Sequence, residues 1–376
     1  MACVGGYKVD MGNDDGMIME TNDTWSLFAY QLEWFAIPCI FIGATLSFMY
    51  STPQTSANKW RLAICSWFSI LLASIACYIC GYDRSRLQLC GSSAIVRAIV
   101  FLLASFLLAF AYPVGIGSSV VALAAFAVEV RVHMLGCKEL PSRVTDHWCS
   151  IMFGGTENCP PVKLIVFFAT LAVSGGVFGW GYIDGFNVAI KNNDANPSHY
   201  LNKTATAFMY GFGRVITINL FCVMLLASRD LVINCLGDRC QNQRRRGDER
   251  HIPQFLHRCM GYSIVVSSFL HLICVYFCYE DSMATHTFMD AYGWSSFITG
   301  WVALLCLALI VASSNEALMK QNPGLWKKGQ YPAGILLVVI LIPHGGEWLS
   351  TYYWQIIIFP MVVYSLHSVI NYCRHH

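Results

Sequence analysis

Long apolar runs separated by short polar segments are the dominant pattern along this chain. Each run approaches or exceeds the ~20 mostly apolar residues that a helix needs to cross a bilayer. The runs cover residues 27–50, 61–81, 94–112, 114–130, 162–184, 207–235, 254–278, 294–316, 332–350 and 355–373. The pattern predicts an all-α, polytopic membrane protein with about ten transmembrane helices.

The third and fourth runs meet at Pro113, with Gly115 and Gly117 close by. Either one long kinked helix or a tight pair of helices fits this arrangement, because proline interrupts a helix and glycine permits a turn. We favour the pair, because a combined length of about 36 residues greatly exceeds one bilayer crossing.

The composition supports a membrane protein and excludes an ordinary cytosolic enzyme. Hydrophobic residues make up 56% of the chain and charged residues only 12%, whereas soluble domains contain roughly 25% charged residues. Most of the 17 cysteines lie inside apolar runs, where a thiol behaves as a small hydrophobe. We therefore expect no disulfide framework, and we expect membrane lipids rather than nucleic acid as partners.

The positions of Lys and Arg predict the orientation. If the N-terminus is cytosolic, most of the 24 basic residues fall on the cytosolic side, as the positive-inside rule requires. The chain begins with acidic and polar residues, without the basic segment of a cleaved signal peptide. We expect an integral multi-pass protein with both termini cytosolic; the sequence does not distinguish the plasma membrane from an endomembrane.

A break in composition divides the chain into two membrane modules. We expect a cytosolic N-terminal segment at residues 1–26 and a four-span module at 27–130. A polar cytosolic linker at 131–161 would then precede a six-span module at 162–376.

Three histidines inside the second module are candidate ligands, because ionisable side chains within a span are functional candidates. His257 and His271 lie 14 residues apart on one predicted helix, which places them on one face and about 21 Å apart along the axis. His344 lies at a depth similar to that of His271. Stacked histidines in a helix bundle suit two haems, although each could instead simply hydrogen-bond a neighbour.

Arg214 lies near the expected outer end of its span. A buried guanidinium requires an anionic partner, and a haem propionate is one candidate. The alternative is that Arg214 extends to the lipid headgroups.

Several segments resemble the transmembrane domain of the NADPH oxidase and ferric reductase family, over about residues 162–376. Leu256-His257 through His271 resembles its third helix. Ile298-Thr299-Gly300 through Cys306 to Ser313-Ser314 resembles its fourth, and His344-Gly345-Gly346-Glu347 its fifth. Phe359-Pro360-Met361 with Tyr364 is similar to the sixth helix, and Asn219 with Arg229 to the second.

The resemblance implies a six-helix bundle with two b-type haems that pass electrons outward to oxygen or ferric iron. His271 and His344 would ligate the outer haem, and His257 one side of the inner haem. The family's remaining histidine corresponds here to Tyr331, 13 residues before His344. Three alternatives follow: ligation of the inner haem by Tyr331, a five-coordinate inner iron, or no inner haem.

The first module resembles the light chain of the phagocyte oxidase flavocytochrome, over about residues 25–135. The resemblance rests on four spans, on Val96-Arg97-Ala98 at the start of the third, and on position beside an oxidase-like module. It implies that this module stabilises the haem module by packing against it. Fusion would make that association intramolecular. Glu33, in the first span, must pair or reach water.

These observations favour transmembrane electron transfer through b-type haem, one or two per chain, most plausibly to oxygen to give superoxide. No dinucleotide-binding glycine motif follows the last span, so FAD and NADPH would act through a further domain or a separate cytosolic reductase. With that domain or partner the protein would be an oxidoreductase. The alternatives are a non-catalytic assembly or scaffold protein descended from an oxidase, and a proton or solute pathway past Glu33, Asp184 and Arg214.

Overall fold

The structure is a computed structural model, and every element that it describes is a helix or a short turn. It describes residues 23–51, 56–82, 93–111, 114–135, 161–197, 200–235, 251–279, 293–314 and 322–345. Nine of the predicted spans correspond to helices within these ranges. Of the predicted linker at 131–161, residues 131–134 belong to the helix Ile116–Met134, and residues 136–160 lie outside the described residues. The tenth predicted span at 355–373 also lies outside them.

The first module consists of four helices, with α1 at its centre. Their bounds are α1 (Asp23–Ser51), α2 (Ser56–Tyr82), α3 (Ser93–Phe110) and α4 (Ile116–Met134). The third and fourth runs form two helices, as their combined length predicts. Ser105 and Ser119 join these helices by reciprocal hydrogen bonds from each hydroxyl to the other's carbonyl, at 2.9 and 2.8 Å.

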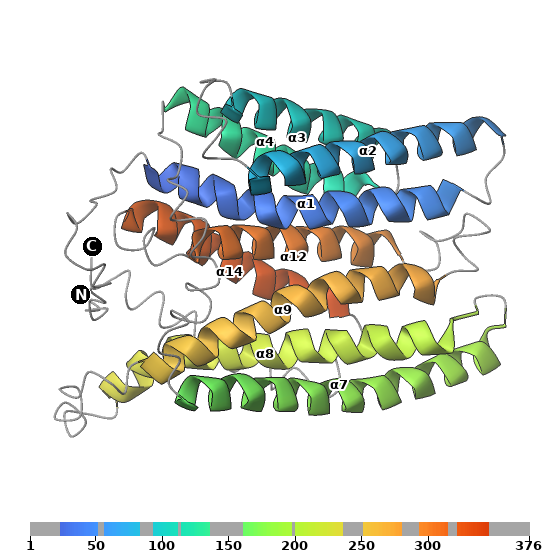
Figure 1. Ribbon diagram of the computed structural model, residues 1–376. Helices are drawn as coiled ribbons and strands as arrows, with labels where there is room; N and C mark the ends of the chain where they lie inside the picture. The colour runs from blue at the N-terminus through green and yellow to red at the C-terminus, as the bar shows by residue number, and fades with distance from the viewer. Residues whose placement is uncertain are drawn as a thin grey trace.

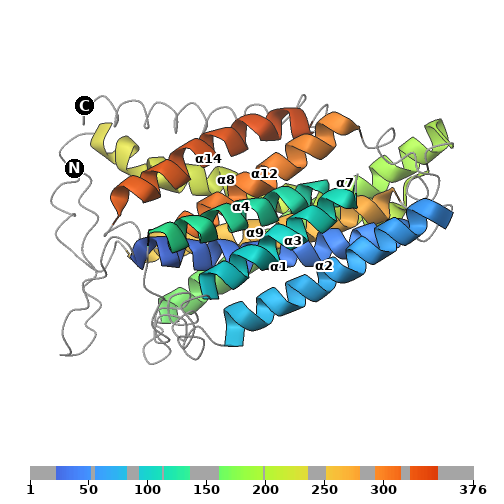
Figure 2. The same cartoon turned by 90° about the horizontal axis from the view of Figure 1, so that it is seen from above.

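The second module contributes five described helices. They are α7 (Pro161–Ala195), α8 (Lys203–Cys235), α9 (His251–Cys278), α12 (Trp294–Ser313) and α14 (Pro323–Gly345). From bottom to top in Figure 1, α7, α8 and α9 precede α12 and α14, and the first module lies above them. Figure 2 shows the same helices from above, with α14 beside α12. Because α12 contacts α1, α4 and α14, it joins the two modules.

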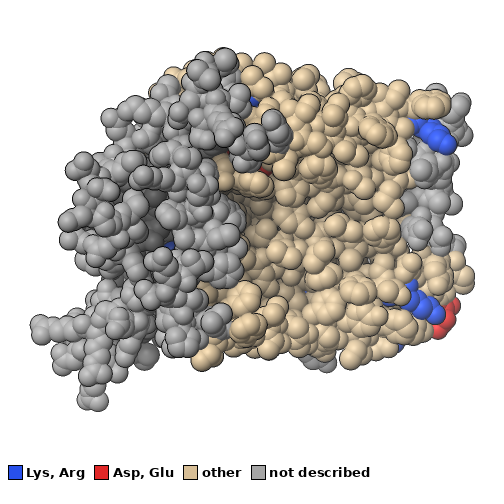
Figure 3. Space-filling model, viewed as in Figure 1, with Lys and Arg blue, Asp and Glu red and all other residues tan. Residues whose placement is uncertain are grey.

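Among the described residues, seven helices are long and apolar enough to cross a membrane, and α3 and α14 contain shorter apolar segments, Ile95–Phe110 and Lys328–Leu341. On the face shown in Figure 3, uncharged residues form a broad band and the visible charged side chains lie mostly at its edge. The chain is therefore an integral, multi-pass membrane protein. The expected total of about ten spans stays a prediction, because the tenth lies outside the described residues.

A buried ionic cluster holds the first module together. Arg97 Nε of α3 lies 2.9 Å from Glu33 Oε1 of α1, and Arg97 Nη2 lies 3.2 Å from Glu129 Oε2 of α4. All three residues are buried. The pairing that the sequence requires for Glu33 is thus supplied within the module, because a charge in an apolar environment is stable only when it is paired.

Small residues explain the close approach of α7 and α8. A Cβ added at Gly181 would lie 2.6 Å from Arg214 Cγ, and one at Gly185 would lie 2.6 Å from Tyr210 Cβ. Helices in membranes associate through such small residues, because lipid supplies no hydrophobic driving force between them. α7 therefore rests on α8 through its glycines, while much of its remaining surface is exposed.

Candidate cofactor site

His271 of α9 and His344 of α14 converge across the second module. Their ring centres are 6.3 Å apart, with an angle of 66° between the ring planes. A metal ion midway between two imidazoles, with bonds of about 2 Å to each nitrogen, would hold the ring centres about 6 Å apart. The two rings are therefore at the separation that a shared metal ion requires.

The hydrogen bonds of both rings favour metal binding by the remaining nitrogen. His271 Nδ1 lies 2.8 Å from the carbonyl oxygen of Met209, and His344 Nδ1 lies 3.0 Å from that of Ser296. A carbonyl oxygen can only accept, so each Nδ1 must carry the proton and donate. Each neutral ring then keeps an unprotonated Nε2, which is the form that ligates metals.

Thr299 adds a second acceptor beside His344. Its Oγ1 lies 3.3 Å from His344 Nδ1 and 2.7 Å from the carbonyl oxygen of Ser295. Because the hydroxyl donates its one proton to Ser295, it accepts from the imidazole. Both acceptors therefore favour the tautomer of His344 that carries its proton on Nδ1.

A glycine on a neighbouring helix faces each imidazole. A Cβ added at Gly300 would lie 2.9 Å from His344 Cε1, closer than a side chain tolerates. A Cβ added at Gly213 would lie 3.4 Å from His271 Cε1, which is ordinary contact. His344 therefore depends on its glycine more strongly than His271 does.

The two histidines line a cavity of about 330 Å³ between α8, α9, α12 and α14. Most of its surface is apolar, and its described lining residues include no Asp, Glu, Lys or Arg. Polar groups come from Tyr210, Thr217, Ser268, Tyr276, Tyr279 and Ser296. This interior is suited to a large, mostly apolar ligand that two imidazoles hold from opposite sides.

The number of protein ligands restricts the kind of metal centre. Within the described residues, no group of three or more His, Cys, Asp or Glu side chains could hold a metal ion. A bare zinc or transition-metal ion normally takes three or four protein ligands. Two opposed histidines in an apolar cavity instead fit a metal whose other ligands come from a planar macrocycle.

Part of this cavity lies in a region that is similar to a known family. Residues 212–342 match the family model described as "Ferric reductase like transmembrane component". The matched region begins one residue before Gly213, includes His271 and ends two residues before His344. The chain therefore contains a ferric reductase-like transmembrane domain, which suggests transmembrane electron transfer. The first module lies outside the matched region, and no curated protein matches the chain.

His257 lies apart from the cavity of the ferric reductase-like domain. It is near the start of α9, it is exposed, and it is absent from the cavity lining. Tyr331 belongs to α14, but its side chain lies outside the described residues. Its neighbour Gln330 joins α14 to α12, because Gln330 Nε2 donates to Ser314 Oγ at 2.7 Å and to the carbonyl oxygen of Ile310 at 3.2 Å.

Arg214 is directed toward α7 and does not line the cavity. It is buried, it forms an ion pair with Asp184, and its guanidinium carbon lies 3.8 Å from the centre of the Trp180 ring. The anionic partner that a buried arginine requires is thus supplied by the chain itself.

Asn219, which the sequence comparison singled out, joins three helices. Its Nδ2 donates to Ser263 Oγ of α9 at 2.9 Å and to Ser174 Oγ of α7 at 3.3 Å. This contact lies away from the cavity lining. In this structure Asn219 therefore stabilises the packing of α7, α8 and α9.

Sequence reasoning missed the residues that support the two histidines. The carbonyl acceptors of Met209 and Ser296 carry no sequence signal, because every residue has a carbonyl group. Gly213 and Gly300 carry a weak one, since glycine within a helix costs about 1 kcal/mol relative to alanine and often marks close packing.

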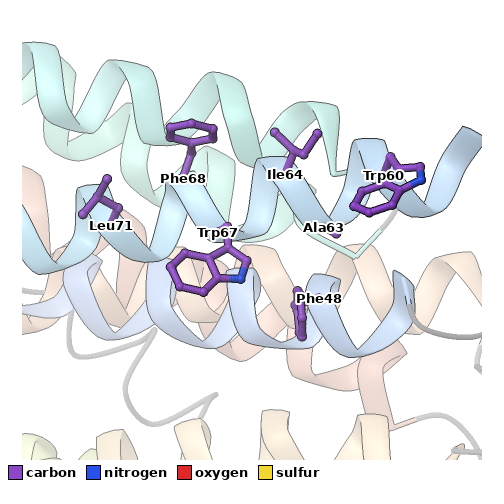
Figure 4. Close-up of a pocket in the computed structure, with 7 residues that line it drawn as sticks. All are labelled: Phe48, Trp60, Ala63, Ile64, Trp67, Phe68 and Leu71. Atoms are coloured by element: carbon purple, nitrogen blue, oxygen red, sulfur yellow. The ribbon is translucent and has the colours of Figure 1, made fainter.

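A second hollow, on the surface of the first module, has a different character. It is a groove of about 410 Å³, lined by Phe48 of α1 and by Trp60, Ala63, Ile64, Trp67, Phe68 and Leu71 of α2. Figure 4 shows these side chains projecting from the two helices. Trp60 and Trp67 are 66% and 67% exposed. The groove presents no metal ligand, and its apolar surface suits contact with lipid.

Proposed function

We propose that this protein carries electrons across a membrane by holding a b-type haem between His271 and His344. The observation that carries the proposal is the pair of imidazoles 6.3 Å apart, each with its Nδ1 directed to a backbone carbonyl. The match of residues 212–342 to a ferric reductase-like domain supports the same function.

The residues present fit haem b in number, tautomer and surroundings. His271 and His344 would hold the iron, the apolar side chains of four helices would surround the ligand, and Gly300 leaves space for the ring of His344. When bound, haem b supplies reversible one-electron chemistry. The backbone hydrogen bonds hold the ring orientations, so the protein fixes the ligand geometry.

The cavity favours oxygen over ferric iron as the acceptor. Histidines on both sides of the metal position would prevent an acceptor from coordinating the metal directly. The lining residues that the structure describes include no carboxylate to hold a ferric cation. A small neutral acceptor suits these surroundings, and transfer of one electron to oxygen gives superoxide.

The donor would act from the opposite side of the membrane. We place both termini in the cytosol on the basis of the distribution of Lys and Arg. An FAD- and NADPH-dependent reductase, either a further domain or a separate protein, would supply electrons at the end of α9 that carries His257. There His257 and Tyr331 are the candidates for holding a second haem.

Arg214 has a structural role in this proposal. Its pairing with Asp184 and its stacking on Trp180 hold α7 against α8. A propionate is therefore not needed to neutralise it.

The test is a reduced-minus-oxidised absorption spectrum of the detergent-purified full chain, with haem quantified per chain. We expect low-spin b-type bands in the wild type and their loss in His271→Ala and His344→Ala. His257→Ala serves as the comparison: it should keep the outer haem, and a fall from two haems to one would assign the second to His257.

The alternative function, a non-catalytic scaffold derived from an oxidase, is favoured by one observation. The chain has Tyr331 at the position where the resembling family has its second inner histidine. A wild-type protein that folds, is monodisperse and contains no haem would refute electron transfer through haem and leave the haem-free alternatives.

A further inference from the structure

The helix that supports His344 has a second face that meets the first module. On α12, Ser296, Thr299 and Gly300 lie at the spacing of one helix face, and all three are close to His344. Phe297 and Trp301, one turn apart on the adjoining face, are buried and line the cavity. A shift of α12 would therefore move the support of His344 and one wall of the cavity together.

Trp301 rests on a glycine of the first module. A Cβ added at Gly117 of α4 would overlap the indole atoms Cγ, Cδ2 and Cε2 of Trp301. Gly117 is itself buried. The indole thus occupies the space that any larger residue at position 117 would need, so its position depends on glycine there.

A second contact between the modules involves α9, the helix that carries His271. Phe35 of α1 and Phe269 of α9 have ring centres 5.1 Å apart, and Phe269 is two residues from His271. The first module therefore contacts both α12, which supports His344, and α9, which carries His271.

We infer that Trp301 is a positioning residue for the cofactor site. Gly117 of the first module leaves the space in which the Trp301 indole packs. The first module thereby fixes one wall of the cavity and the register of α12 against His344. This inference rests on the proposed haem site, and it adds a specific contact through which residues outside the ferric reductase-like match control that site.

The central experiment compares three glycine-to-alanine variants of the full chain. Gly117→Ala should displace the indole and reduce haem per folded chain at least about twofold, or shift the low-spin bands and the midpoint potential. Gly43→Ala is the matched control, because a Cβ there would overlap Ser118 within the first module. It should lower thermal stability but leave the spectrum unchanged. Gly175→Ala should change neither, since no described atom lies within 4 Å of that Cβ.

A double-variant experiment separates positioning from general damage. Trp301→Ala removes Cγ, Cδ2 and Cε2, which are the indole atoms that an alanine at position 117 would meet. If Gly117→Ala acts through the indole, it should therefore cause no further loss of haem in a chain that already carries Trp301→Ala. General destabilisation would instead make the two losses add.

The outcomes distinguish this inference from the proposed function. A haem-free wild type overturns both. A wild type that binds haem, together with a Gly117→Ala variant of wild-type haem content, spectrum and potential, overturns only the positioning role. Equal spectral changes in Gly117→Ala and Gly43→Ala also overturn it, because the effect would then be a general consequence of disturbing the first module.

Discussion

The two modules use buried polar groups in opposite ways. In the first module, Arg97 engages both Glu33 and Glu129, so the charged groups face one another within the packed helices. In the second, His271 and His344 each use one ring nitrogen for a backbone carbonyl and line a cavity. The first arrangement joins helices, whereas the second leaves a nitrogen on each ring for a ligand.

The modules also differ in how their helices are enclosed. In the candidate membrane span of α1, 61% of the residues are buried, whereas in that of α7 only 17% are buried. α1 is therefore the centre of its module, while α7 lies at the periphery of the second and exposes most of its surface to lipid. Substitutions in the first module should mainly change stability, and substitutions around the cavity should mainly change cofactor binding.

The largest effect is expected from Arg97→Leu. The substitution leaves two carboxyl groups buried without their guanidinium, and breaking a buried ion pair in this way costs about 3–5 kcal/mol. Thermal unfolding of the purified protein measures the loss. Arg131→Gln, at an exposed arginine of the same module, is the control. Haem per folded chain should be unchanged in both variants. Selective loss of haem from folded Arg97→Leu would show that the ionic cluster of the first module also controls cofactor binding.

A smaller loss of stability, with a large spectral effect, is expected from Gly300→Ala. The added methyl group would lie 2.9 Å from His344 Cε1, and such overpacking costs about 1–3 kcal/mol. The imidazole must move, so the low-spin absorption bands should weaken or shift. Gly213→Ala, whose methyl group would lie 3.4 Å from His271 Cε1, should retain the spectrum. Identical spectra for wild type and Gly300→Ala would contradict the assigned role of His344.

Asp184→Asn should have a modest effect on stability. It removes the negative charge beside Arg214, but the Asp184 side chain is 42% exposed, so solvent screening limits the loss to about 1 kcal/mol. The absorption spectrum should not change, because Arg214 faces α7. Asp194→Asn, at an exposed site near the end of α7, provides the baseline. A spectral shift in Asp184→Asn would show that Arg214 does act on the cofactor.

The smallest effect is expected from Asn219→Ala. This variant loses hydrogen bonds to Ser174 and Ser263, and such bonds between membrane helices are worth about 0.6 kcal/mol on average. The melting temperature should fall slightly, while haem content stays constant. Ser74→Ala is the reference, because that exposed hydroxyl bonds only to its own helix, at Ile70. A loss of haem in Asn219→Ala would assign Asn219 to the site.

Much of the fold was predictable, because the membrane limits a chain to few solutions. The apolar runs predicted an all-α, multi-pass protein, which the helices confirm, and the length around Pro113 predicted the α3–α4 pair. The histidine spacing and its resemblance to ferric reductases predicted the domain that residues 212–342 match. The resemblance of the first module to a flavocytochrome light chain stays a prediction, as do the roles assigned to His257 and Tyr331.

The sequence by itself determined which segments are apolar enough to be candidate membrane spans and that His271 and His344 lie at a common depth, because both follow from hydropathy and helical rise along one helix at a time. The tertiary structure decided which side chains meet. Arg214 pairs with Asp184, Arg97 with two glutamates, and Trp301 rests on Gly117. Such pairings depend on the rotation of each helix and on the close approach of distant ones. Tertiary packing fixes both.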